Sequence, residues 1–123
     1  MTPYLLESHL VADCRRAAEA MGVVLEVAGQ LRAKGSGSDR GLPDGFLHAG
    51  GRTLCVEFKR PATDDGTRAG RFSLDQLAAA ERRRLCGVET YVPSSLQEFV
   101  RLANWARHGD PHDLPDCATV PHL

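Results

Sequence analysis

The chain has 123 residues, of which 42% are apolar and 25% are charged, so it can form one compact domain with a hydrophobic core and has little room for a second. Its formal net charge of −1 excludes a protein that binds polyanions through overall basicity. Any nucleic-acid surface must therefore come from a local cluster of basic residues.

No apolar stretch approaches the roughly 20 residues that span a bilayer, and the N-terminus lacks the layout of a signal peptide. The four cysteines are scattered without a C-x-x-C pair, which favours buried, reduced thiols over a disulfide framework. We therefore expect a soluble, cytoplasmic protein without a membrane partner.

The N-terminal segment, residues 2–22, has the pattern of an amphipathic helix. Thr2 can cap it, Pro3 suits the first helical position and Gly22 can end it. Apolar residues recur at helical spacing. The predicted apolar face consists of Leu6, Leu10, Val11, Cys14, Ala17, Ala18 and Met21.

The next part of the chain predicts strands. Residues 23–33, rich in valine and leucine, predict the first strand, and residues 34–41 (KGSGSDRG) have the composition of a connector. Residues 45–49 and 52–60 predict a hairpin, because the dipeptide Gly50-Gly51 between them tolerates the positive φ angles of tight hairpin turns.

Two further helices are predicted, each with a serine that can form a capping box. The first begins with Ser73 and Gln76, and the second with Ser95 and Glu98. The short apolar segment VETYV between them predicts another strand.

The predicted order is α-β-β-β-α-β-α, which indicates an α/β fold with a mixed four-stranded sheet flanked by helices. We expect a folded domain over residues 1–109, and an irregular, proline-rich tail over residues 110–123.

Three polar residues of the hairpin are candidates for chemistry. Glu57 and Lys59 share one face of the second strand with Cys55, and a charged pair there is costly unless it is paired or binds a metal. The hairpin folds Asp44 back beside them, near Lys59 or just beyond it. Two carboxylates at one sheet edge suit Mg²⁺, which can polarise a phosphodiester and activate a water. Lys59 would orient that water or neutralise developing charge.

An ordinary structural role is the alternative for each of these residues. An aspartate between proline and glycine is a common turn residue, and Glu57 and Lys59 could form a surface ion pair. The combination of Pro43-Asp44 with a later Glu-x-Lys on one hairpin is more specific, and it favours the metal site.

The same motifs resemble those of the PD-(D/E)XK nucleases, and more closely those of their VRR-NUC family. The matching segments are GLPDGFL, VEFKRP and FSLDQLAAAERRRLCGVETYVPSS, and the resemblance covers about residues 5–105. It implies a restriction-endonuclease-like α/β/α core and Mg²⁺-dependent hydrolysis of DNA phosphodiesters, with Mn²⁺ able to substitute. Small stand-alone members are often phage-encoded, homodimeric and associated with branched DNA such as four-way (Holliday) junctions.

The resemblance also implies roles for individual residues. Asp44, Glu57 and the carbonyl of Phe58 would bind the metal, and Lys59 would be the catalytic lysine. An early helical glutamate of the family matches Glu7, a further metal ligand; the alternative is a glutamate favoured by the helix dipole.

A family glutamine that contacts the catalytic site matches Gln76. Its capping box with Ser73 explains the same residue without a catalytic role, and the sequence does not decide between the two.

Basic residues after the hairpin are candidates for contacts with the DNA backbone. Arg60, Arg68 and Arg71 lie in or next to the polar loop that follows the Glu-x-Lys strand. The run Arg82-Arg83-Arg84 points in different directions around its helix and includes solvated surface. No helix-turn-helix, zinc finger or stacking motif predicts sequence-specific recognition.

Two other functions remain open from the sequence. One is a non-catalytic nuclease-fold protein that binds DNA or a partner. The other is a metal-binding regulatory protein that uses side chains of the C-terminal segment, His108, His112, Cys117 and His122.

Overall fold

A computed structural model of the chain describes residues 7–27, 42–59 and 72–122. Along the chain its elements are α1 (Glu7–Met21), β1 (Val24–Val27), β2 (Gly45–Ala49), β3 (Arg52–Val56), α2 (Leu74–Leu85), β4 (Thr90–Tyr91) and α3 (Leu96–His108). Their order confirms the predicted α-β-β-β-α-β-α arrangement. The predicted cap at Thr2 and Pro3 and the connector 34–41 lie outside the described residues. None of the described helices is long and apolar enough to cross a membrane.

The four strands form one mixed sheet, as predicted, and their order in the sheet is β1-β2-β3-β4. β1, β2 and β3 are antiparallel neighbours, whereas β4 is parallel to β3 and is reached through α2. Gly50 and Gly51 form the turn between β2 and β3 with φ angles of 58° and 80°, which confirms the predicted tight hairpin.

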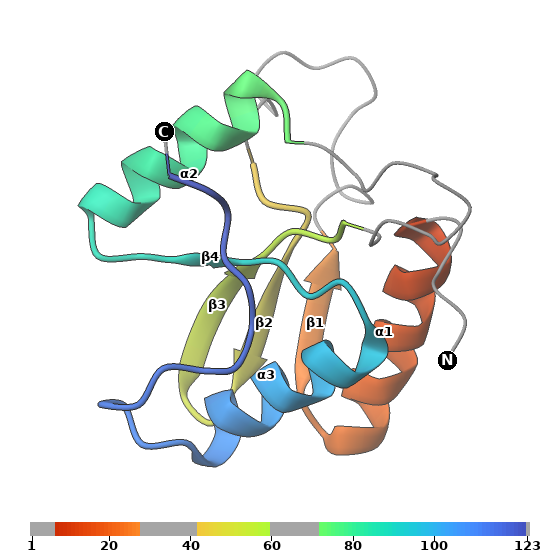
Figure 1. The fold of residues 1–123 in the computed structure, drawn as a ribbon. Coiled ribbons are helices and arrows are strands. Elements are labelled where there is room, and N and C mark those ends of the chain that lie inside the picture. The colour runs from red at the N-terminus through yellow and green to blue at the C-terminus, as the bar shows by residue number, and fades with distance from the viewer. Residues whose placement is uncertain (1–6, 28–41, 60–71, 123) are drawn as a thin grey trace.

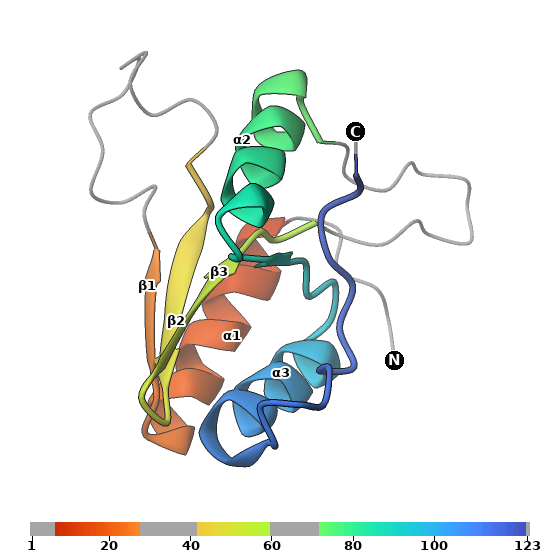
Figure 2. The ribbon, with the colours of Figure 1, turned by 90° about the vertical axis from the view of Figure 1, so that its left-hand side faces the viewer.

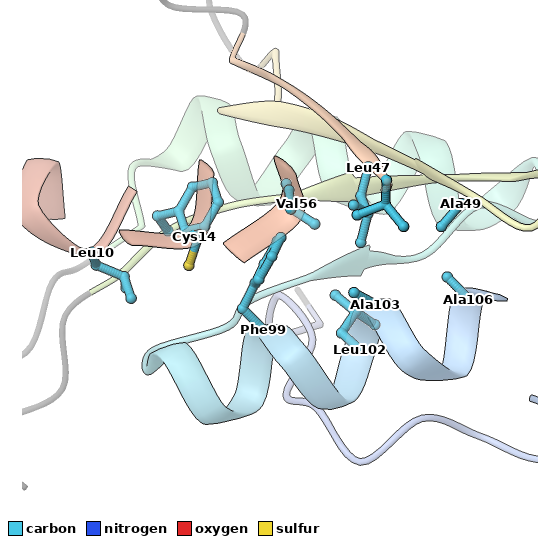
Figure 3. Packing of buried hydrophobic residues seen from close by; sticks show 12 residues of the cluster. Leu10, Cys14, Leu47, Ala49, Val56, Phe99, Leu102, Ala103 and Ala106 are labelled. Atoms are coloured by element: carbon cyan, nitrogen blue, oxygen red, sulfur yellow. The ribbon is translucent and has the colours of Figure 1, made fainter. Parts of the chain in front are cut away.

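Helices α1 and α3 cover one face of this sheet. Figure 2 shows the two helices on the same side of β1, β2 and β3. Leu47 and Val56 project from the sheet into the layer between, and Phe99 of α3 lies against them (Figure 3). The buried residues of this main core are Leu10, Cys14, Ala18, Val23, Leu47, Ala49, Val56, Phe58, Phe99, Leu102, Ala103 and Ala106. The predicted face of α1 therefore supplies the core, as its spacing indicated.

Helix α2 packs on the opposite face, at the β3–β4 edge. In Figure 1, α2 and α3 lie on opposite sides of β4. A second, smaller core joins Ala80 of α2 to Val92 and Val120, with Phe72 and Leu77 packed against it. The sheet is thus flanked by helices on both sides, although α2 covers it only near this edge.

The C-terminal segment runs along β4. The N–H of Val92 donates to the carbonyl of Ala118 at 2.7 Å, and the N–H of Val120 donates to the carbonyl of Thr90 at 3.0 Å. Tyr91 and Thr119 form an isolated antiparallel bridge. Because the side chain of Val120 is completely buried, this segment contributes to the second core although most of its backbone is irregular.

The two predicted capping boxes differ in outcome. At α2 both halves form, since Ser73 Oγ accepts from the N–H of Gln76 and Gln76 Oε1 accepts from the N–H of Ser73. At α3 only the first half forms. Ser95 Oγ accepts from the N–H of Glu98, but the Glu98 carboxylate binds the N–H and hydroxyl of Ser94 instead. Ser94, the residue before the cap, offers the Glu98 carboxylate two donors, its N–H and its hydroxyl.

The cysteines are all free, but they are not all buried. Cys14 and Cys55 are buried and Cys117 is half-buried, whereas Cys86 is exposed. The expectation of buried thiols is therefore wrong for Cys86, because it follows the last residue of α2 and belongs to neither core.

Arg52 anchors the hairpin turn to the end of α3. Its guanidinium donates to the carbonyls of Trp105 and Gly109 at 2.9 and 2.6 Å, and lies 4.6 Å from the centroid of the Trp105 ring. The Trp105 carbonyl also accepts from the N–H of Gly109 at 2.7 Å, so Arg52 gives it a second donor and gives the Gly109 carbonyl a partner beyond the end of the helix. Arg52 therefore acts within the fold, at the end of the hairpin remote from Glu57.

Candidate functional site

The candidate site lies at the open end of the hairpin, where β2 begins and β3 ends. Gly45 pairs with Val56, so the next position outward brings Asp44 opposite Glu57. The N–H of Asp44 donates to Glu57 Oε1 at 3.0 Å, and the N–H of Phe58 donates to Asp44 Oδ2 at 2.9 Å. Each carboxylate thus accepts from the other strand, and the two are held side by side.

This register corrects one prediction. The sequence placed Asp44 near Lys59 or just beyond it, whereas the structure places it opposite Glu57. The two-residue turn fixes the pairing along the whole hairpin. The strand also ends at Val56 rather than at residue 60. The next hydrogen-bonded pair outward would join residues 43 and 58, but Pro43 has no N–H and the N–H of Phe58 is donated to the Asp44 side chain.

Glu57 is buried although it is acidic. Its side chain is 1% exposed, and its N–H donates to the carbonyl of Tyr91 at 2.8 Å, which continues the parallel pairing one step beyond β3. Its neighbours Val56 and Phe58 point the other way, into the main core. Alternation along the extended chain therefore forces Glu57 toward α2.

Gln76 meets Glu57 from the first turn of α2. Its Nε2 donates to Glu57 Oε2 at 3.1 Å, while its Oε1 accepts from the N–H of Ser73 at 2.9 Å. The sequence offered a capping role and a site role as alternatives. One amide group fulfils both, because its two ends face different partners.

The environment of Glu57 opposes its negative charge. Burial, followed by repulsion from Asp44, raises the pKa of Glu57 from 4.5 to about 8, against smaller opposing effects of Lys59, the Asp44 N–H and Arg83. Both carboxylate oxygens nevertheless receive a donor, which is the arrangement that an ionised carboxylate requires. A cation beside the two carboxylates would reconcile these facts.

The residues present fit a hard cation. Mg²⁺ is commonly held by one or two protein carboxylates and keeps several waters, and Asp44 and Glu57 supply such a pair. Within the described residues no group of three or more histidine, cysteine or acidic side chains could hold a metal ion. That the Phe58 carbonyl binds the metal stays a prediction.

Glu7 stays a prediction as well. It is the first residue of α1, and its side chain lies outside the described part of the structure. Helix α1 begins at the same end of the sheet at which β2 begins and β3 ends (Figure 1). The backbone topology therefore brings the start of α1 to the end of the sheet that carries the two carboxylates.

The predicted basic residues are only partly described. Lys59 is half-buried, and its Nζ lies 5.3 Å from the centroid of the Phe72 ring, at the entrance to α2. The predicted DNA-binding residues Arg60, Arg68 and Arg71 lie outside the described residues.

The arginine run of α2 has structural partners. Arg84 binds Glu81, Glu89 and the carbonyl of Val120, so it fastens the C-terminal segment to α2. Arg83 Nε donates to Thr90 Oγ1 at 2.9 Å.

Sequence reasoning missed the contribution of Arg83 to the site. Its positive charge lowers the pKa of Glu57, and its partner Thr90 is completely buried opposite Cys55. The signal that could have found it is its spacing from Gln76. Seven residues are two helical turns, which place both side chains on the same face of α2.

The C-terminal histidines and cysteine do not form a comparable site. The described residues there include His108, His112, Cys117 and His122, and no group of three of them is close enough to share a metal. Burial raises the pKa of the Cys117 thiol to about 12, which disfavours the thiolate that zinc binds.

Comparison of the chain with protein-family models, curated proteins and solved structures gave no match.

Proposed function

We propose that the protein is a metal-dependent endodeoxyribonuclease of the VRR-NUC type within the PD-(D/E)XK superfamily. The observation that carries the proposal is the direct linkage of Asp44 to Glu57 at the end of a hairpin that continues to Lys59. These are the acidic and basic residues of the motif, and the fold brings the two acids into contact across thirteen positions of sequence separation. The mixed sheet with α2 between β3 and β4 is compatible with a restriction-endonuclease-like core.

Each residue has a defined role in the proposed reaction. Asp44 and Glu57 hold a divalent cation, Mg²⁺ or Mn²⁺, which supplies Lewis acidity and lowers the pKa of the attacking water. Gln76 holds the Glu57 carboxylate from the side opposite to Asp44. Lys59, next to the metal ligands, orients the water or offsets negative charge that develops on the phosphate.

The substrate is proposed to be DNA, held mainly through its phosphates. A protein with a formal charge of −1 binds DNA through a local basic surface, for which Arg60, Arg68 and Arg71 are the candidates. The resemblance favours branched DNA such as four-way junctions, a homodimer that brings two sites to two strands, and action in the cytoplasm, including that of a phage-infected host.

Cleavage assays on defined DNA test this function. Purified protein is incubated with supercoiled plasmid, a synthetic four-way junction and a duplex of matched sequence, each with Mg²⁺, Mn²⁺ or EDTA. We expect cleavage that requires the metal. Asp44→Ala and Glu57→Ala should reduce it to background, and Lys59→Ala should slow it by about 10²–10³-fold.

Glu19→Gln serves as the control variant, because Glu19 is an exposed glutamate of α1 outside the site. It should cleave like the wild type. Metal-independent cleavage, or full cleavage by Asp44→Ala, contradicts the proposal. DNA binding without cleavage under any metal would instead support the alternative, a non-catalytic nuclease-fold module that binds DNA or a partner.

A further inference from the structure

The amide of Gln76 connects two parts of the fold that are otherwise separate. Its oxygen accepts from the N–H of Ser73 at 2.9 Å, and its nitrogen donates to Glu57 Oε2 at 3.1 Å. An amide has one accepting end and one donating end. If the amide were turned by 180°, its oxygen would face the Glu57 carboxylate oxygen, and its NH₂ would face the N–H of Ser73, so neither hydrogen bond could form. The orientation of the amide that allows one of these hydrogen bonds is therefore the same orientation that allows the other.

Ser73 is well placed to fix this orientation. Its backbone is extended, with φ −73° and ψ 163°, and its hydroxyl accepts from the N–H of Gln76 at 3.1 Å. Its carbonyl accepts the first helical bond, from Leu77, at 3.0 Å. Leu77 and Ala80 in turn pack α2 onto the second core. The N–H of Ser73 thus lies at the start of a helix that packs onto the second core.

We propose that Ser73 is a positioning residue for Glu57 and acts through its backbone N–H. That N–H selects the end of the Gln76 amide that faces the carboxylate. With Asp44 donating to Oε1 and Gln76 to Oε2, the plane of the Glu57 carboxylate is fixed, and each oxygen keeps a lone pair for a cation. The consequence for metal binding rests on the proposed function, whereas the orientation of the amide does not.

Two substitutions of Ser73 separate its N–H from its hydroxyl. Ser73→Ala removes the hydroxyl and keeps the N–H. Ser73→Pro removes both, and the observed φ of −73° suits the proline ring. Both variants lack the hydroxyl, and they differ in the N–H and in the proline ring, which the observed φ accommodates. Ser95→Ala removes the equivalent serine cap from α3, where the Ser95 hydroxyl accepts from the N–H of Glu98 rather than from a residue of the site, and controls for the loss of a cap.

Two measurements follow the proposed contact. In metal-free protein, NMR measures hydrogen exchange of the side-chain NH₂ of Gln76, with the exposed Gln97 of α3 as internal reference. Separately, the dissociation constant for Mn²⁺ alone is measured for each variant. We expect slow exchange at Gln76 in wild type and Ser73→Ala, and exchange as fast as at Gln97 in Ser73→Pro. Mn²⁺ should bind Ser73→Pro about 10–100-fold more weakly than Ser73→Ala, while Ser95→Ala keeps the wild-type value.

The two readouts keep this inference apart from the proposed function. A wild type that binds no Mn²⁺ and cleaves no DNA contradicts the function, while the exchange data still decide the role of Ser73. Slow exchange at Gln76 in Ser73→Pro, or equal Mn²⁺ affinity of both Ser73 variants, overturns the inference. If Ser73→Pro does not fold, the backbone amide proton of Ser73 decides instead. It should exchange slowly in wild type and rapidly in Gln76→Ala, and equal rates overturn the inference.

Discussion

Raising the pH of the metal-free protein from about 5 to about 8 should lower its free energy of unfolding, because Glu57 must ionise in a buried site. The pKa of Glu57 is raised from 4.5 to about 8 in the folded protein. Below the lower value both states carry the proton, and the folded state has its full stability. Between the two values only the unfolded state has lost the proton, so stability falls by about 1.4 kcal/mol per pH unit. Above about pH 8 the loss is complete.

The expected effect is large compared with the stability of a small domain. Between about pH 5 and about pH 8, the ionisation of Glu57 should lower the free energy of unfolding by roughly 3–4 kcal/mol. The total free energy of unfolding of domains of this kind is about 5–15 kcal/mol. Urea titrations in EDTA at several pH values, followed by the fluorescence of the single tryptophan, measure it. Glu57→Gln removes the titrating group, so the difference between wild type and this variant isolates the effect of Glu57 from that of all other groups.

The exposed Glu19 again provides the matched control, and Glu19→Gln should keep the pH slope of the wild type. Mg²⁺ or Mn²⁺ at saturating concentration should remove most of the wild-type slope, because a cation at Asp44 and Glu57 replaces the proton. Equal slopes for wild type and Glu57→Gln in EDTA would refute the reasoning, since they would mean that burial does not oppose the charge of Glu57.

Three further predictions concern the fold that supports the site. Gly50→Ala should destabilise by roughly 3 kcal/mol or more and Gly51→Ala by about 1–2 kcal/mol, because both have positive φ but only at Gly50 would a Cβ lie 2.6 Å from a carbonyl of α3. Equal losses in urea denaturation would contradict this packing. Val120→Ala should cost roughly 2 kcal/mol and Leu114→Ala less than about 0.5 kcal/mol, since the first side chain is fully buried and the second is 91% exposed; a reversed order in thermal denaturation would exclude the docked C-terminal segment. Arg52→Met should destabilise by about 2 kcal/mol and shift tryptophan emission, and an unchanged spectrum would argue against the observed stacking.

The order of the elements followed from local patterns. The periodicity of the first helix predicted the buried positions Leu10 and Cys14, and Ser73 marked the start of α2. These predictions succeed because helix spacing and capping are determined within a few residues of sequence. The same locality explains the error at Ser95, where a competing donor on the preceding residue captured the Glu98 carboxylate.

The sequence predicted that Asp44 and Glu57 lie close together, but it did not predict how they pair. The motif singled out Asp44 and Glu57, and Gly50-Gly51 indicated the turn that joins them. The pairing of Asp44 with Glu57 instead of Lys59 follows from the two-residue turn, which pairs Ala49 with Arg52 and so fixes the register of the whole hairpin. The burial of Glu57, in contrast, required α2 to pack against the β3–β4 edge, and this depends on contacts between segments that are distant in sequence.

By itself the sequence determined the alternation of helices and strands, the hairpin and the residue types at its open end, since these depend on neighbouring residues. Only the tertiary structure decided that Gln76 both caps α2 and binds Glu57. It also decided that the charge of Arg83 acts on Glu57 and that Val120 belongs to the second core. Each of these contacts joins two elements of the fold. Which elements come into contact is determined by which of their faces are buried together, and no local sequence pattern specifies that.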